Sequence, residues 1–136
     1  MTGADAQLVW KPHRDFSLHL AQSFAHVKAS RDTVDDDLPE SAPDWITSLL
    51  ASWRIASGVS LSAAVYHTDR MMWLSDGDAT DGYTRADLRL ARQFRLNGAD
   101  AEWVLGVQNV TDDGYAEFRR ENIFSRRAYG TLRFAW

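Results

Sequence analysis

The chain has 136 residues, a formal net charge of −4 and no cysteine. The length corresponds to one domain, the negative charge argues against nucleic-acid binding, and the lack of cysteine excludes disulfides and thiolate metal sites. Six Trp, six Phe and four Tyr are many aromatic rings for so short a chain. No apolar run approaches the ~18 residues of a transmembrane helix, and no secretory signal is visible at the start, MTGADAQ.

Apolar and polar residues alternate with a period of two in seven segments, which predicts seven β-strands. In chain order these segments are residues 4–11, 16–24, 45–55, 59–72, 84–94, 101–107 and 128–136. The longer ones match or exceed the ~9–11 residues of a tilted membrane-spanning strand. The only helical structure expected is a turn or two over residues 115–121.

Short and long connections alternate along this series of strands. Short ones are expected at residues 12–14, 56–58 and 97–98, and Asn97-Gly98 predicts a type I′ hairpin turn because both residues tolerate positive φ. Long polar ones are expected at about residues 30–42, 75–82 and 112–122. Transmembrane β-barrels have this arrangement, with tight turns on one side of the membrane and long loops on the other.

The two faces of the predicted strands differ in chemistry. The polar faces carry Arg54, Arg85, Asp87, Arg89, Glu102 and Arg133, which suit a wet lumen or a solvated sheet. The apolar faces carry a Trp near strand ends, at Trp10, Trp45, Trp53, Trp103 and Trp136. These rings fit the core of a soluble sandwich, but indoles also prefer the membrane interface, which favours a barrel whose apolar face meets lipid.

The last strand places Leu132, Phe134 and Trp136 at every second position. This pattern resembles the C-terminal signature of outer-membrane β-barrels. The resemblance implies that the closing strand is recognised by the barrel assembly machinery.

More specific motifs lie in residues 82–136. They are Asp87-Leu88-Arg89 after the aromatic Tyr83, the segment Asn109-Val110-Thr111-Asp112 followed by Tyr115, and the Arg-rich stretch from Arg126 to the terminal Trp136. This region resembles the C-terminal end of a TonB-dependent outer-membrane receptor. Phe124-Ser125-Arg126-Arg127 replaces the Pro-Gly-Arg that usually precedes the closing strand of that family.

The resemblance implies an all-β fold, an antiparallel up-and-down meander of about seven strands that is an incomplete segment of a 22-stranded transmembrane β-barrel. Residues 1–136 are then expected to be the C-terminal part of a receptor barrel in the outer membrane of a Gram-negative cell, without plug domain or signal peptide. The parent receptor would import a ferric siderophore, cobalamin or a similar large ligand, and the isolated chain would not transport. Expected partners are outer-membrane lipid, the barrel assembly machinery and, only through the missing N-terminal part, the TonB complex.

Ligand contacts in that family come from extracellular loops. The candidate residues here are Asp35, Asp36, Asp37, Asp76, Asp78, Asp81, Arg119 and Arg120. The acidic runs can also be solvated surface, and Asp76, Asp78 and Asp81 could bind calcium, although the EF-hand Glu is missing. His67 and Asp69 share a strand face but lack a Ser or a third ligand, so we expect no enzyme, cofactor, metal or nucleic-acid partner.

Two other classes stay open. A soluble β-barrel carrier of the lipocalin or fatty-acid-binding type fits the length, but it would need an apolar interior, and the face opposite the Leu, Val and Trp positions is polar. A β-sandwich binding module would need two packed sheets and gives no reason for alternating loop lengths.

Overall fold

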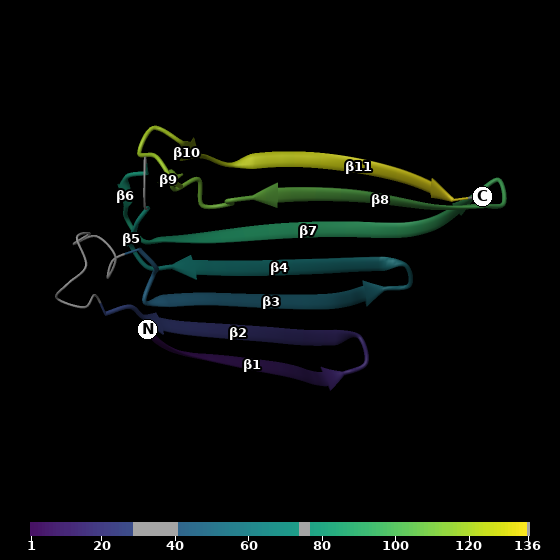
Figure 1. The fold of residues 1–136 in the computed structure, drawn as a ribbon. Coiled ribbons are helices and arrows are strands. Elements are labelled where there is room, and N and C mark those ends of the chain that lie inside the picture. The colour runs from purple at the N-terminus through teal and green to yellow at the C-terminus, as the bar shows by residue number, and fades with distance from the viewer. Residues whose placement is uncertain (29–40, 74–76, 136) are drawn as a thin grey trace.

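The computed structural model describes residues 1–28, 41–73 and 77–135 (Figure 1). Seven long strands form one antiparallel sheet in the order β1-β2-β3-β4-β7-β8-β11. Their bounds are β1 Thr2–His13, β2 Phe16–His26, β3 Trp45–Ala56, β4 Val59–Thr68, β7 Tyr83–Leu96, β8 Ala99–Gln108 and β11 Arg127–Ala135. The all-β, antiparallel meander of seven strands predicted from the sequence is therefore confirmed. Within the described ranges, no helix is long and apolar enough to cross a membrane.

All three tight connections lie at one end of the sheet, which we call the turn end (Figure 1). They join β1 to β2, β3 to β4 and β7 to β8. Asn97 and Gly98 have φ values of 52° and 86°, as a type I′ turn requires, so this hairpin prediction is confirmed. We call the opposite end, where β2, β4 and β8 end, the loop end.

Two of the long connections carry small hairpins that the hydrophobic pattern did not predict. The connection from β4 to β7 contains β5, Met71–Met72, paired with β6, Ala79–Thr80. The connection from β8 to β11 contains β9, Tyr115–Ala116, paired with β10, Ile123–Phe124. The expected helical turn over residues 115–121 is wrong: the chain enters β9 there, and Phe118 has a φ of 65°, which a right-handed helix does not allow.

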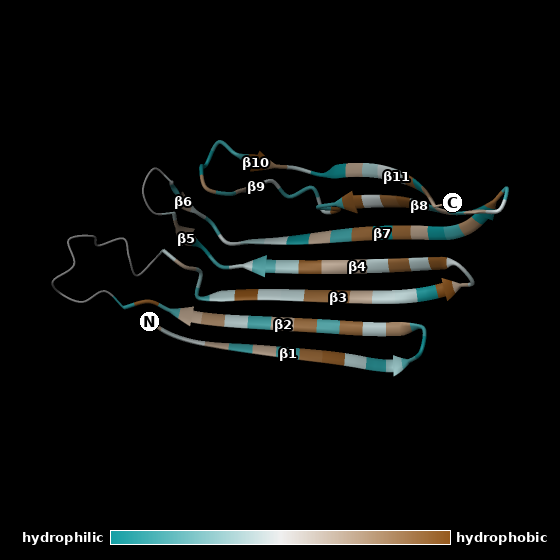
Figure 2. Cartoon of the chain, turned by 45° about the vertical axis from the view of Figure 1, so that its right-hand side comes forward, coloured by the Kyte–Doolittle hydropathy of each residue, from teal (hydrophilic) through white to brown (hydrophobic). Residues whose placement is uncertain are grey.

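Register keeps most of the apolar residues of the seven strands on one face of the sheet. One cross-strand row illustrates this, since Leu18 pairs with Ala51, Ala51 with Ala63, and Ala63 with Leu88. Because successive strand residues point to opposite faces, a slip of one residue in any strand would break the row. Figure 2 shows the alternating hydropathy along each strand. We call this side the apolar face and the other the polar face.

The apolar face has nothing packed against it in the described structure. Its large side chains are exposed: Leu8, Trp10, Leu20, Trp45, Trp53, Leu61, Val65, Leu88, Leu105, Leu132 and Phe134. Buried hydrophobic residues are few and mostly small, namely Ala64, Ala91, Ala101, Val104 and Tyr115. A β-sandwich needs a second sheet over the first, whereas the seven long strands form a single layer.

A row of polar side chains crosses the apolar face near the loop end. Gln22 pairs with Thr47, Thr47 with His67, and His67 with Thr84. Their polar atoms are hydrogen-bonded, because Thr47 Oγ1 donates to Gln22 Oε1 at 2.8 Å and His67 Nδ1 lies 2.8 Å from Thr84 Oγ1. The apparent interruption of the alternation at Gln22 is therefore the first member of a paired polar row.

Candidate functional site

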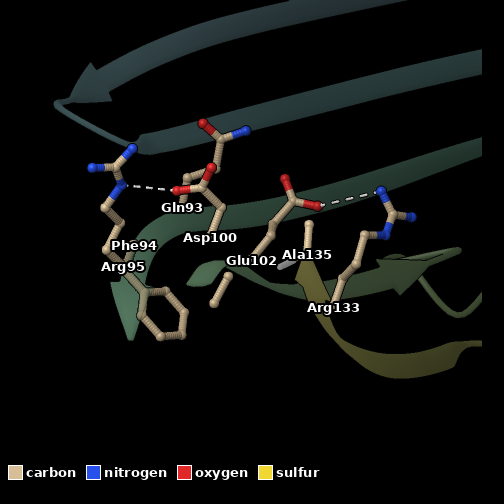
Figure 3. A pocket seen from close by; sticks show the side chains of 8 residues that line it. Gln93, Phe94, Arg95, Asp100, Glu102, Arg133 and Ala135 are labelled. Atoms are coloured by element: carbon tan, nitrogen blue, oxygen red, sulfur yellow. Dashed lines mark hydrogen bonds and ion pairs between the residues drawn. The ribbon is translucent and has the colours of Figure 1, made fainter. Parts of the chain in front are cut away.

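The hollows along the sheet open mainly on the polar face. Figure 3 shows one at the turn end, lined by Gln93, Phe94, Arg95, Asp100, Ala101, Glu102, Arg133 and Ala135. Most of these residues point to the polar face, and Arg95 Nε donates to Asp100 Oδ1 at 3.0 Å. Two further hollows along the middle strands are lined by polar-face residues such as Ser62, Tyr66, His19 and Ser48. The hollows of the described sheet thus lie mainly on its polar face.

Charges on this face form cross-strand pairs. Glu102 lies between two cations: its Oε1 is 3.9 Å from Arg89 Nη2 on β7, and its Oε2 is 4.0 Å from Arg133 Nη1 on β11. Glu102 is only about one-fifth exposed, so the pairing offsets part of the cost of removing its carboxylate from water. Arg89, part of the Asp-Leu-Arg motif, therefore ties β7 to β8.

The other motif residues meet where β8 enters its long connection. Asn109 is 1% exposed and has a φ of 52°, a conformation that Asn tolerates better than most residues. Its backbone N–H donates to Asp87 Oδ1 at 3.0 Å, and its side-chain Nδ2 donates to Asp113 O at 2.9 Å. Thr111 Oγ1 donates to Asn109 Oδ1 at 3.2 Å. Asp87 and Asn109, 22 positions apart in the chain, thus anchor one turn to the wall of the sheet.

Arg85 links this anchor to the loop end. Its Nη1 donates to Tyr115 Oη at 3.2 Å, and its guanidinium carbon lies 4.7 Å from the centre of the Tyr66 ring. Its Nε is 3.2 Å from Asp87 Oδ1 but is buried without the geometry of a hydrogen bond. Arg85 on β7 therefore contacts Tyr66 on β4, Asp87 on its own strand and Tyr115 on β9.

Tyr115, which accepts from Arg85, is the middle member of a stack of three aromatic rings. The centres of Tyr83 and Tyr115 are 4.1 Å apart, and those of Tyr115 and Phe124 are 5.4 Å apart, with nearly parallel planes. Tyr83 Oη donates to Glu117 Oε1 at 2.7 Å. The stack joins the start of β7 to both strands of the β9–β10 hairpin.

The two hairpin-bearing connections are bonded to each other. Asp78 N–H donates to Phe118 O at 2.9 Å, and Arg120 N–H donates to Asp78 Oδ2 at 3.1 Å. Arg120 Nε also donates to Ala79 O at 3.2 Å. The rings of Trp73 and Phe118 meet edge to face at 5.7 Å between centres. We call residues 71–73, 77–83 and 115–124 the loop unit.

The structure brings together part of the predicted ligand-binding set. Asp78 and Arg120 are in direct contact, and a hollow of the loop unit is lined by both Asp81 and Arg120. Arg119 lies over the Phe118 ring at 5.8 Å. Asp76 and the three residues Asp35, Asp36 and Asp37 fall outside the described residues.

The remaining residues of the C-terminal motifs lie apart from the Asp87–Asn109 contact. Asp112 Oδ1 accepts a hydrogen bond from Arg126 N–H at 2.8 Å, which closes the base of the third long connection. Leu88, Leu132 and Phe134 lie on the apolar face, where Leu132 pairs with Trp103. Trp136 falls outside the described residues.

Sequence reasoning missed Trp73, Phe118 and Glu117 as parts of the loop unit. Their partners are 34 to 45 positions away, and no periodic pattern marks such contacts between loops. Tyr83 and Tyr115 were visible as motif residues, but their stacking was not. Among the described residues, no group of three or more His, Cys, Asp or Glu side chains is placed to hold a metal ion.

Comparison with models of protein families and with curated proteins found no match for this chain.

Proposed function

We propose that the chain forms part of the wall of a TonB-dependent receptor barrel in the Gram-negative outer membrane. The apolar face meets lipid, the polar face lines the lumen, and the loop unit faces the cell exterior. The observation that carries this proposal is the apolar face, which extends over all seven strands with its large side chains uncovered. A soluble domain rarely exposes so continuous an apolar surface.

The aromatic residues at the turn end support a tilted, membrane-spanning sheet. Trp10 on β1 lies in the cross-strand row of Leu18. Trp53 on β3 lies two residues nearer the turn end than this row. Trp103 on β8 lies two residues nearer still, and Phe134 on β11 a further two, so the line moves six residues over the six steps from β1 to β11. The aromatic line thus shifts about one residue, or about 3.4 Å, for each strand step of about 4.8 Å. That slope corresponds to a strand tilt of about 35°, within the range of transmembrane barrels.

The height of the apolar band agrees with this tilt. Trp45 and Trp53 lie eight positions apart on β3 and bound the band at the two ends, with Phe24 beside Trp45 at 4.8 Å. Eight residues span about 26 Å along a strand, which is about 22 Å along the membrane normal at this tilt. Outer-membrane barrels have an apolar band of about 25 Å between two aromatic girdles.

Most of the polar exceptions on the apolar face lie near its borders. Arg92 shares a row with Trp103 at the turn end, where a long side chain can reach the headgroups. His67 and Thr84 lie close to the loop-end border once the tilt is included, and each is hydrogen-bonded to the other. Gln22 on β2 lies nearer the middle of the band, where both polar atoms of its amide are hydrogen-bonded.

The receptor class rests on the motif residues of β7 and β8, which meet in the Asp87–Asn109 anchor. In the proposed parent receptor, the loop unit contributes to binding a ferric siderophore or similar large ligand through Asp78, Asp81, Arg119 and Arg120. The chain has no catalytic role in this proposal. Its partners are outer-membrane lipid and the barrel assembly machinery, which would read Leu132 and Phe134, and the TonB complex would act through another part of the receptor.

Refolding into vesicles of phosphatidylethanolamine and phosphatidylglycerol tests the proposal. We compare the unaltered chain with Leu105→Arg, which puts a charge at the centre of the apolar face, where Leu105 is 56% exposed. Such a charge costs about 2–4 kcal/mol near the bilayer midplane, so we expect the fraction resistant to urea extraction to fall at least about tenfold.

Thr131→Arg is the matched control. Thr131 is one position from Gly130, the cross-strand partner of Leu105, and it is exposed on the polar face. The control should insert as the unaltered chain does, because an arginine there would point into the lumen. Equal extraction of both variants, or a chain that stays folded in buffer without lipid, would contradict the proposal.

A further inference from the structure

A second hollow at the turn end carries more positive than negative charge. It has a volume of about 380 Å³ and is lined by residues of the β1–β2 connection and of the β3–β4 hairpin. Its lining includes three exposed cations, Lys11, Arg14 and Arg54, and one carboxylate, Asp15. We call it the basic hollow. Because its cations are exposed, a ligand in solution can reach them.

Asp15 joins the two walls of the basic hollow. Its backbone O accepts from Arg54 N–H at 2.7 Å, which ties the β1–β2 connection to β3. Its carboxylate faces two guanidinium groups, with Oδ1 at 3.3 Å from Arg54 Nη1 and Oδ2 at 3.4 Å from Arg14 Nε. One negative charge balances only one of these two arginines. Lys11 adds a further positive charge, since it has no hydrogen bond or ion pair to any other residue that the structure describes.

The hollow drawn in Figure 3 shows that this excess is not general at the turn end. That hollow holds two cations, Arg95 and Arg133, with two carboxylates, Asp100 and Glu102. Arg95 Nε is 3.0 Å from Asp100 Oδ1, and Arg133 Nη1 is 4.0 Å from Glu102 Oε2. Its charges are therefore balanced by side chains, whereas the charges of the basic hollow favour an added anion.

Neutral donors lie beside the cations of the basic hollow. The hydroxyls of Ser17 and Ser60 line it and have no hydrogen-bond partner among the described residues. Arg54 uses Nη1 on Asp15, and its guanidinium has further N–H donors. A phosphoryl group fits this set, because it carries up to about two negative charges and several strong acceptor oxygens. A carboxylate has less charge and fewer acceptor oxygens, so it would leave more of these donors unused.

We propose that the basic hollow is a binding site for a phosphoryl group, held by Arg54, Arg14 and Lys11. The planar forks of the two arginines match phosphoryl oxygens in a bidentate way, and the Lys11 ammonium supplies a further charge. The phosphoryl group can belong to a soluble phosphate ester or to a lipid headgroup, and both sources present the same chemistry. The site goes beyond the proposed barrel wall, because nothing in a lipid-covered sheet requires an anion at this hollow.

Calorimetric titration with inorganic phosphate tests the site. The full chain is held in micelles of a neutral detergent, which covers the apolar face and leaves both ends of the sheet open to solvent. We expect saturable one-to-one binding with a Kd of about 1 mM or lower, which weakens as added sodium chloride screens the charges. Succinate carries its negative charges on carboxylates, so binding of succinate as tight as that of phosphate would overturn the assignment.

Two variants and a control locate the bound phosphate. Arg54→Gln removes a charged donor and should raise the Kd for phosphate about tenfold. It also breaks the contact with Asp15, so Lys11→Gln, which loses no described contact, is the second variant and should raise the Kd about threefold. Arg95→Gln removes the same charge from the balanced hollow at the same end and should leave the Kd unchanged. Equal weakening in all three variants would mean that phosphate responds only to overall charge and would contradict the site.

Competition with bound phosphate identifies the source of the phosphoryl group. Glycerol 3-phosphate is added in solution, and phosphatidylglycerol is mixed into the micelles. Competition by the lipid would assign a headgroup, and competition by glycerol 3-phosphate alone would assign a soluble ester. Competition by neither would overturn the proposal. Because none of these measurements requires insertion into a bilayer, failure of the phosphate site and failure of the proposed barrel function are distinguishable.

Discussion

At the scale of single residues, Asn109 determines how β8 turns into its long connection. It combines a positive φ with three hydrogen bonds, and it is almost fully buried. A right-handed conformation would move its N–H away from Asp87 and break the link between the turn and the wall. The Asn-Val-Thr-Asp motif is therefore explained by backbone geometry as well as by side-chain chemistry.

Two substitutions separate these contributions. Asn109→Ala removes both side-chain hydrogen bonds and forces alanine, whose Cβ disfavours it, into a positive φ. Asn109→Gly removes the same bonds, but glycine adopts a positive φ without steric cost. We expect Ala to lower local stability by about 2–3 kcal/mol and Gly by roughly 1 kcal/mol less. Hydrogen exchange of residues 109–116 in the vesicle-bound protein measures this difference. Equal protection in both variants would mean that the φ of Asn109 carries no cost.

At the scale of elements, the loop unit is held together by hydrogen bonds between the β4–β7 connection and the β8–β11 connection. The Asp78 carboxylate accepts from the backbone of Arg120, 42 positions later. Trp73 packs against Phe118 and also donates from its indole Nε1 to Thr80 Oγ1 at 3.2 Å. A change in the connection from β4 to β7 should therefore loosen the connection from β8 to β11.

Trypsin can report this coupling, because Arg119 and Arg120 are cleavage sites in the connection from β8 to β11. Asp78→Ala removes a charged acceptor, worth about 1.5–3 kcal/mol, and should raise cleavage after these arginines roughly tenfold. Asp81→Ala is the control, since Asp81 is exposed and has no hydrogen bond or ion pair to any other described residue. Similar cleavage of the two variants would show that the connections move independently.

The sequence pattern predicted the long strands well, because alternation is enforced wherever one face of a sheet is apolar over its whole width. The predicted segment 45–55 corresponds to β3 within one residue, and 84–94 to β7 within two. The segment 59–72 was too long, since β4 ends at Thr68 and Met71–Met72 form a hairpin instead. The loop unit could not be predicted, because it depends on contacts between connections, where no period exists.

At the scale of the whole molecule, stability does not come from a core. The buried hydrophobic residues are few, and the largest apolar side chains lie on one open face. A seven-stranded sheet of this kind gains little from folding in water, since burial of apolar surface is the main favourable term for soluble domains. The apolar face is uncovered in the described structure, and lipid would cover it in the proposed membrane setting.

The aromatic rows make the proposed membrane position measurable. With the other tryptophans replaced by Phe, single-Trp chains that keep Trp45 or Trp53 should be quenched more by nitroxides near the lipid headgroup than by nitroxides deep in the acyl chains. A third chain with Leu49→Trp as its only indole should show the reverse, because Leu49 lies midway between them on the apolar face of β3. The reason is geometric: the two native positions are about 11 Å from the band centre at a tilt of 35°, and Leu49 is at it. The same order of quenching in all three chains would mean that β3 lies along the membrane surface and does not cross it.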